Sequence, residues 1–243
     1  SLKSNSILAN YLMAVLLEKQ GKYADSESIL RVAYGYSPKV EEIALAYVRV
    51  LRKNKNLELA KTVLSSFSTD SSELDVLKQN AYVAFDTNDL QSAELYVARV
   101  LQQNPNDLEF LLFRAKILIE KNDYIHAVSL LDMYARQDSS SIDYLILRAR
   151  VQLDWSKNTN AATETVEKAL QSYPDNPDAL MFAARISSIT DAPVAGKYAD
   201  ELASMVLSKN PDNQDALLYA LKGLIQRANW QEAYTISKKL IQK

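Results

Sequence analysis

The sequence predicts an all-α protein built as a solenoid of about seven helical hairpins. Only four glycines and six prolines occur in 243 residues, and 48% of the residues are hydrophobic, a composition that suits helices and is poor in turn-rich sheet. One order of small, aromatic and apolar residues recurs about every 34 residues along the chain. Each recurrence holds two apolar patterns of helical period separated by a polar break, which predicts two helices joined by a short turn.

The repeat is clearest in NDLQSAELYVARVLQQNPND, which begins at Asn88. Similar segments divide the chain into seven units: 7–40, 41–73, 74–107, 108–141, 142–176, 177–213 and 214–243. We expect these units to form a single solenoid domain over residues 1–243. Because the chain starts inside a predicted helix and stops directly after an apolar one, we also expect it to be a fragment of a longer protein.

A small residue recurs at one place in the first helix and at one place in the second helix of the units. Two helices approach closely only where small side chains meet, so these residues predict a constant crossing geometry and hence a superhelix. The first helices carry Ala14, Ala81, Ala115, Ala149 and Ala184, and the second helices carry Ser26, Ala60, Ala93, Ala127, Ala162, Ala199 and Ala233.

The hairpins also end alike. Asn104-Pro105, Tyr173-Pro174 and Asn210-Pro211 stand just before the next first helix, and an Asp or Asn pair follows each proline. Proline suits this connection because it lacks the N–H that a continuing helix needs. Together with the small and aromatic residues, these seams resemble the tetratricopeptide repeat (TPR) family over almost the whole chain. The resemblance implies a right-handed superhelix with a concave groove lined by the first helices.

Two connections depart from the repeat, and the register is hardest to assign there. The fifth unit has an extra residue around Trp155, Ser156 and Lys157, and the sixth has a longer segment between its helices, 190–193. The family's tryptophan near the start of the first helix is absent from every unit.

In the family, the second, fifth, ninth and twelfth places of each first helix face the groove. The second place is acidic in six units, which the helix dipole alone explains. The ninth place is a cation in five units, and nothing about a helix midpoint demands one. This basic row is the better candidate for ligand contact, with pairing to neighbouring acidic side chains as the alternative. It comprises Arg49, Lys116, Arg150, Arg185 and Lys222.

The third unit differs, because Lys78, Tyr82 and Phe85 occupy its fifth, ninth and twelfth places. Aromatic residues beside a cation are typical of interaction hot spots, although apolar helix residues more often pack in a core. These three residues and the basic row form the predicted partner-binding site. Guanidinium groups bond carboxylates in a bidentate way, so we expect a partner with acidic segments or a terminal carboxylate.

The sequence offers little for catalysis, metal binding or cofactor binding. There are no cysteines, one histidine (His126) on an expected helix surface, and no glycine-rich loop that would cradle a phosphate. We therefore expect no enzyme activity, no metal and no cofactor. The net charge of -2 and the acidic second-place row argue against nucleic acid as a partner.

These observations favour a protein–protein interaction scaffold or adaptor that binds a peptide or protein in its groove. The alternative is a structural component that self-associates or stacks end to end through its terminal repeats, because the last helix exposes apolar residues. No stretch is apolar enough for direct membrane insertion. The compartment stays open: cytoplasm is the default, and a bacterial periplasm or cell envelope fits a cysteine-free chain equally well.

Overall fold

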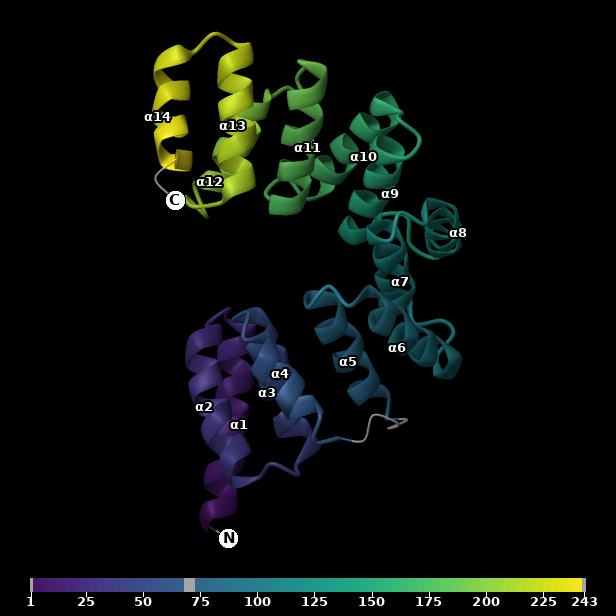
Figure 1. Cartoon of the computed structure of the whole chain (residues 1–243), viewed down its shortest axis with the longest axis vertical. Coiled ribbons are helices and arrows are strands. Elements are labelled where there is room, and N and C mark those ends of the chain that lie inside the picture. The colour runs from purple at the N-terminus through teal and green to yellow at the C-terminus, as the bar shows by residue number, and fades with distance from the viewer. Residues whose placement is uncertain (1, 68–72, 242–243) are drawn as a thin grey trace. The chain divides into compact units, whose positions relative to one another are not determined.

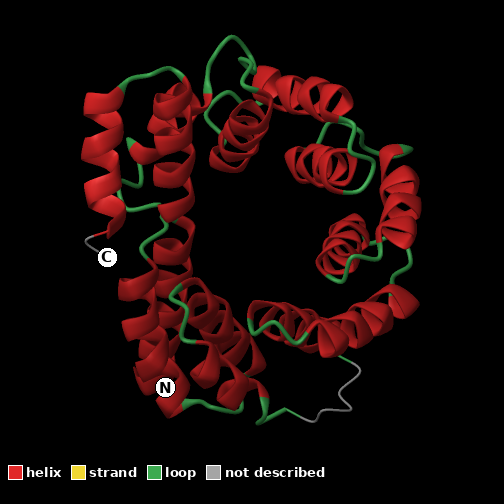
Figure 2. Cartoon of the chain, turned by 45° about the horizontal axis from the view of Figure 1, so that its top comes forward, coloured by secondary structure: helices red, strands yellow, loops and turns green. Residues whose placement is uncertain are grey.

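The computed structural model describes residues 2–67 and 73–241, and most of these residues lie in helices joined by turns and loops (Figure 2). Within them fourteen helices follow one another and no strand forms, which confirms the all-α fold. The helices are α1 (Leu2–Lys19), α2 (Tyr23–Tyr36), α3 (Glu41–Lys53), α4 (Leu57–Leu64), α5 (Leu74–Asp86), α6 (Leu90–Gln103), α7 (Leu108–Glu120), α8 (Tyr124–Ala135), α9 (Ile142–Asp154), α10 (Thr159–Ser172), α11 (Pro177–Thr190), α12 (Ala199–Leu207), α13 (Gln214–Gln226) and α14 (Trp230–Ile241).

The chain divides into two compact units (Figure 1). Unit 1, Ser1–Lys121, holds α1 to α7, and unit 2, Asn122–Lys243, holds α8 to α14. Inside each unit, helices that are neighbours in sequence pack against each other, as α1 does with α2 and α13 does with α14. Each first helix of a hairpin also packs against the second helix of the hairpin before it, as α3 does on α2 and α13 does on α12.

The small residues lie where the helices cross, as the sequence predicts. All five alanines of the first helices are 0% exposed, and those of the second helices are 5% exposed or less. In the first hairpin the contact is also polar, because the Ser26 hydroxyl donates to the Ala14 carbonyl oxygen at 2.8 Å. This hydrogen bond satisfies a buried hydroxyl where the helices are closest.

The seams between hairpins are stabilised by helix capping. The carboxylate of Asp107 accepts the backbone N–H of Phe110 at 3.2 Å, and the side-chain oxygens of Asn176 and Asn213 accept equivalent N–H groups at 3.0 and 2.9 Å. Each of these three residues is the second member of the polar pair that follows a seam proline. An N-cap of this kind satisfies an N–H that has no partner inside the helix, and it fixes where the next first helix begins.

The turn inside most hairpins contains one residue in the left-handed backbone region. Gly21 and Asn88 occupy it with φ of 74° and 60°, and these residue types adopt it most readily. Lys55, Lys157 and Ala228 adopt the same conformation in their turns. A residue with a β-carbon is strained there, so the turn geometry is imposed by the packing of the two helices rather than by the local sequence.

The two irregular connections fold without disturbing the pairing of their helices. After α9, Trp155 stacks on Tyr124 with ring centroids 6.2 Å apart, and the backbone N–H of Ser156 reaches back to the Val151 carbonyl. Between α11 and α12, Val194 and Lys197 exchange two backbone hydrogen bonds around a tight turn, and Val194 is buried. The added residues are therefore absorbed in turns outside the helices.

One close helix contact of unit 2 involves a glycine. Gly223 on α13 faces the start of α12, and a β-carbon at Gly223 would lie 2.5 Å from the backbone nitrogen of Asp200. The helices can approach this closely only because residue 223 lacks a side chain.

Candidate partner-binding surface

The eight predicted partner-binding residues all lie on first helices, and they fall in both units. We call them the first-helix row. In unit 1, Arg49 lies on α3, three residues lie on α5, and Lys116 lies on α7. In unit 2, Arg150 lies on α9, Arg185 on α11 and Lys222 on α13. Within each unit, the members of the row have the contacts described below.

Arg49 binds a carboxylate of its own unit. Its Nε and a terminal nitrogen donate to the two oxygens of Glu18 at 3.1 and 3.2 Å, which is the bidentate geometry of a strong arginine–carboxylate pair. Glu18 lies in the last turn of α1, so the pair joins two successive first helices. A ligand carboxylate at Arg49 would have to compete with Glu18.

Tyr82 and Phe85 belong to an aromatic cluster between α5 and α7. The Tyr82 ring centroid is 4.7 Å from that of Phe113 and 5.3 Å from that of Phe110, and Phe85 meets Phe113 edge-on at 5.3 Å. Phe110 and Phe113 are buried, whereas Tyr82 and Phe85 are half-buried. The cluster thus packs α5 against α7 and also leaves parts of two rings at the surface.

Polar contacts surround this cluster. The Tyr82 hydroxyl donates to the carboxylate of Glu109, and the guanidinium of Arg52 lies 4.5 Å from the Tyr82 ring centroid. Burial, followed by the hydrogen bond to Glu109, raises the pKa of Tyr82 well above its ordinary value, so the hydroxyl stays protonated and can donate. Lys78 pairs with the Asp107 carboxylate at 2.8 Å and is likewise engaged inside the unit.

Lys116 differs from the other cations of unit 1. Its ammonium lies 5.0 Å from the centroid of the Phe85 ring, and its side chain is exposed. Among residues 2–67 and 73–241, no carboxylate forms an ion pair with it. A cation–π contact at the surface is worth only about 0.5–1 kcal/mol, so this ammonium can turn toward a ligand at little cost.

In unit 2, one carboxylate serves two arginines. Asp154, the last residue of α9, accepts from Arg185 on α11 at 2.5 and 3.4 Å, and its other contact is Arg150 on its own helix at 3.6 Å. The guanidinium of Arg185 also lies 5.5 Å from the centroid of Phe182. These two members of the row are therefore held in place by one acidic side chain.

Lys222 on α13 resembles Lys116. Its ammonium lies 5.6 Å from the centroid of Tyr219 and its side chain is exposed. Within the described part of the chain, it too has an aromatic ring as a neighbour and no ion pair. Lys78 also lies 5.1 Å from the centroid of Phe110, but it is paired with Asp107. Each unit thus presents one exposed lysine of the row above an aromatic ring and, among the described residues, without an ion pair.

Comparison with known proteins identifies the repeat. Residues 84–151, which run from the end of α5 into α9, match the family model of the tetratricopeptide repeat. This segment contains tetratricopeptide repeat sequence. This match covers fewer than half of the residues, and the likeness of the remainder is one of fold. No curated protein matches the chain.

Solved structures share the TPR fold over most of the chain. A tetratricopeptide repeat protein from Parabacteroides merdae is 14% identical, with a TM-score of 0.69 over 98% of this chain and 93% of that one. PilW, described as a widely conserved type IV pilus biogenesis factor, is 15% identical, with a TM-score of 0.66 over 83% and 92%. Human IFIT1, solved as a dimer with PPP-AAAA, is 17% identical, with a TM-score of 0.67 over 99% of this chain and 62% of that one.

The sequence did not reveal the carboxylates that pair with arginines of the first helices. Glu18, Asp86 and Asp154 lie in the last turn of α1, α5 and α9, and each accepts from an arginine on another first helix. Glu18 and Asp154 hold Arg49 and Arg185 of the first-helix row, whereas Asp86 holds Arg52, which is outside it. A carboxylate at a helix C-terminus is disfavoured by the helix dipole. Acidic residues in this unfavourable place, repeated along the chain, are a sequence feature from which such pairing could have been suspected.

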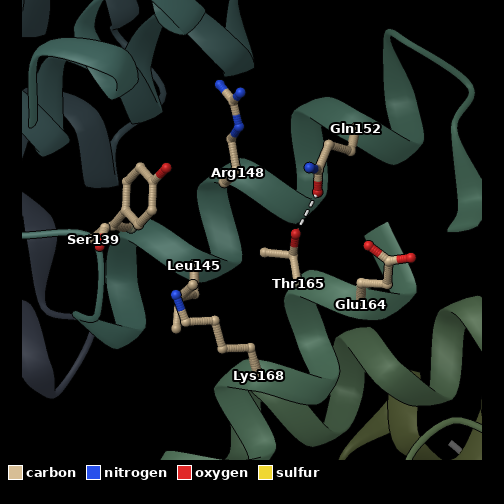
Figure 3. Close-up of a pocket in the computed structure, with 8 residues that line it drawn as sticks. Ser139, Leu145, Arg148, Gln152, Glu164, Thr165 and Lys168 are labelled. Atoms are coloured by element: carbon tan, nitrogen blue, oxygen red, sulfur yellow. Dashed lines mark hydrogen bonds between the residues drawn. The ribbon is translucent and has the colours of Figure 1, made fainter. Parts of the chain in front are cut away.

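A separate pocket of about 300 Å³ lies between α9 and α10 of unit 2 (Figure 3). Arg148 and Gln152 line it from α9, and Thr165 and Lys168 line it from α10. Three of these groups are already engaged, because Arg148 pairs with Asp132 at 2.9 Å and the Thr165 hydroxyl donates to Gln152 at 2.8 Å. None of the eight residues that line the pocket belongs to the first-helix row.

His126 lies in the first turn of α8, where its Nδ1 is 2.8 Å from the carboxylate of Asp123, the residue that caps the same helix. Its side chain is 74% exposed, as expected of a helix-surface residue. Among the residues that the structure describes, no group of three or more His, Asp or Glu side chains is placed to hold a metal ion. No helix in that part of the chain has the length and apolar character needed to cross a membrane.

Proposed function

We propose that this TPR chain is a protein-interaction scaffold that binds a peptide or protein partner through the first-helix row. The observation that carries the proposal is the contrast within the row. Arg49, Lys78 and Arg185 are bonded to carboxylates of the chain, whereas Lys116 and Lys222 are exposed above aromatic rings. The engaged side chains order the surface, and the two lysines are available to a ligand.

The chemistry of this surface favours a partner segment that carries both a carboxylate and an apolar side chain. A carboxylate would bind the Lys116 ammonium, and an apolar group would pack on the exposed parts of Phe85 and Tyr82. Aromatic residues beside a cation are enriched among residues that dominate binding energy. An acidic segment or the C-terminal carboxylate of a chain, next to an apolar side chain, has this chemistry. We expect the partner to bind as a peptide that crosses successive first helices.

Two of the structures with this fold bear on the choice of partner class. PilW is described as a pilus biogenesis factor, which fits a role in assembling other proteins. Human IFIT1 was solved with the RNA PPP-AAAA, so this fold also binds nucleic acid. Here the acidic second place of the first helices, including the exposed Glu109, would repel phosphates, and we favour protein over RNA. We propose no catalytic role for the chain.

The test is affinity capture from cell extract with the wild-type chain and with Lys116→Glu/Lys222→Glu. The matched control is Lys39→Glu/Lys209→Glu, which makes the same charge change in each unit at exposed lysines that follow α2 and α12. We expect partners to bind the wild type and the control and to bind the Lys116/Lys222 variant at least about tenfold more weakly, a change of about 1.4 kcal/mol. Equal helicity of the three proteins by circular dichroism excludes unfolding as the cause.

Two outcomes would contradict the proposal. Partners that bind all three proteins equally would move the binding surface away from the first-helix row. Captured RNA, with an affinity that falls steeply as salt rises, would replace the protein partner by a nucleic acid.

A second function, self-association as part of a larger assembly, is favoured by a different observation. The first and last helices expose large apolar side chains, including Leu12 and Leu16 on α1 and Trp230 and Tyr234 on α14, each more than half exposed. Terminal repeats of a solenoid that stays monomeric normally have a polar outer face. Two expectations stay predictions: that residues 1–243 form one solenoid domain, and that the protein works in the cytoplasm by default, with a bacterial periplasm or cell envelope as the alternative.

A further inference from the structure

Helix α1 is apolar on the side that the rest of unit 1 leaves uncovered. No charged residue occurs between Lys3 and Glu18. Leu8, Leu12, Met13 and Leu16 are between 51% and 56% exposed, although a helix that is apolar all round is normally buried. These four residues and the exposed Ala9 form what we call the α1 face.

Helix α3, the first helix of the following hairpin, shows what covers the corresponding side of a helix that has a hairpin before it. In α3, the positions 34 residues further along than Ala9, Leu12, Met13 and Leu16 are Ile43, Ala46, Tyr47 and Val50, and all four are at most 5% exposed. Helix α3 packs on α2, where the Tyr47 and Tyr34 rings meet at 5.6 Å and the Asn54 side chain donates to the Tyr23 carbonyl at 3.1 Å. Apart from Leu8, whose counterpart Glu42 is exposed, the α1 face therefore corresponds to a side of α3 that is buried within the array.

The last helix exposes the complementary side. In α2 the residues that meet α3 include Tyr23, Glu27 and Tyr34. When Ala233 is aligned with Ser26, these places in α14 hold Trp230, Tyr234 and Ile241, which are 65%, 63% and 81% exposed. We call these three residues the α14 face. Inside the chain, this side of a second helix covers the first helix of the following hairpin. In α14 it carries two exposed aromatic residues and an exposed isoleucine, so it is apolar like the α1 face.

We propose that α14 of one copy packs on α1 of a second copy in the way that α2 packs on α3 inside the chain. The proposal deepens the second proposed function, self-association, and rests on it; it does not depend on ligand binding by the first-helix row. In this contact Ile241 would meet Met13, as Tyr34 meets Tyr47. The amide of Gln20, at the place of Asn54, would donate to the carbonyl of Trp230.

Such a contact is head to tail, since two different faces meet. Each copy would keep one face open, so association continues into chains or closes into a ring. The contact involves essentially one helix on one helix, which is a small interface, and we expect association that depends on protein concentration in the micromolar range.

The experiment measures molar mass by light scattering coupled to size-exclusion chromatography, over a wide range of loading concentrations. Leu12→Glu places a charge on the α1 face and Tyr234→Glu places one on the α14 face. Both side chains are more than half exposed, so the folded monomer should tolerate the changes. The matched control is Leu95→Glu on α6, a residue 61% exposed and outside both faces.

We expect the wild type and the control to gain mass with concentration and each face variant to stay monomeric. An equimolar mixture of the two face variants should form a dimer and nothing larger, because it contains one intact α14 face and one intact α1 face. A wild type that stays monomeric at every concentration would overturn both self-association and this contact. A mixture that stays monomeric, or a Tyr234→Glu variant that still associates alone, would leave self-association standing and overturn the head-to-tail contact.

Discussion

Two members of the basic row, Lys116 of unit 1 and Arg185 of unit 2, are held by different means, although Arg49 of unit 1 pairs with a carboxylate as Arg185 does. Each of the two contacts the first helix that precedes it in the sequence. Lys116 of unit 1 meets the ring of Phe85, whereas Arg185 of unit 2 meets the carboxylate of Asp154. Where the preceding helix offers a ring, the cation stays available to a ligand, and where it offers a carboxylate, the cation is held inside the chain. A pattern of charge that repeats along the sequence therefore corresponds to two different local surfaces.

Removal of the aromatic cluster should have the largest effect on stability. Phe113→Ala should lower the free energy of unfolding by about 3–5 kcal/mol, because it removes a buried ring that contacts three other rings. The matched change in unit 2, Phe182→Ala, deletes a ring that is equally buried and lies below Arg185, and we expect it to cost about 1 kcal/mol less.

Urea unfolding of both variants gives these two costs, and hydrogen exchange shows which unit opens. Both losses should be nearly independent of salt, because they come from apolar packing. Equal costs in the two units would show that the aromatic cluster adds nothing beyond ordinary burial.

Removal of the shared carboxylate of unit 2 should have a smaller effect that depends on salt. Asp154→Asn should cost about 1 kcal/mol, because Arg150 and Arg185 lose a charged acceptor that is 20% exposed. The control Glu164→Gln removes an exposed carboxylate from α10 of the same unit and should be close to neutral.

The cost of Asp154→Asn, measured by urea unfolding, should shrink in high salt, whereas that of Phe113→Ala should not. The same variant should also bind an acidic partner more tightly than the wild type does, because Arg185 is released. Unchanged affinity would show that the arginines of unit 2 are structural only.

The smallest expected effect concerns pH and is confined to unit 1. The hydrogen bond with Glu73, partial burial, and the negative charges of Glu73, Glu42 and Asp75 raise the pKa of Glu41 to about 7 from its ordinary 4.5. Between these values the folded state keeps a proton that the unfolded state has lost. Stability should therefore rise as pH falls from about 7 to about 4.5, and this contribution is lost as pH rises through 7.

Glu41→Gln should flatten the stability profile in that window, by less than about 1 kcal/mol because the side chain is partly solvated. Glutamine is already present at the first position of α13, Gln214, so the change suits a helix start of this fold. Thermal unfolding at several pH values tests this, and a variant whose profile keeps the wild-type slope between pH 4.5 and 7 would contradict it.

Much of the fold could be predicted because its determinants are local. Each determinant acts within one hairpin or across one seam, so it can be recognised in a short stretch of sequence. These determinants are the apolar period, the small residues such as Ala14 and Ser26, and the helix caps such as Asp107. The same reasoning placed the eight site residues on first helices. It left open whether Tyr82 and Phe85 belong to the core or the surface, and the half-buried rings between α5 and α7 show that they contribute to both.

By itself, the sequence determined that this chain folds into TPR-like hairpins with the basic row on their first helices, because helix periodicity and close packing depend on neighbouring residues. Only the tertiary structure decided which of those cations are engaged. Arg49 finds Glu18 and Arg185 finds Asp154 across two hairpins, while Lys116 reaches a ring instead. Such pairs join residues far apart in sequence, and whether charged atoms come within bonding distance depends on how the helices cross and how the side chains turn.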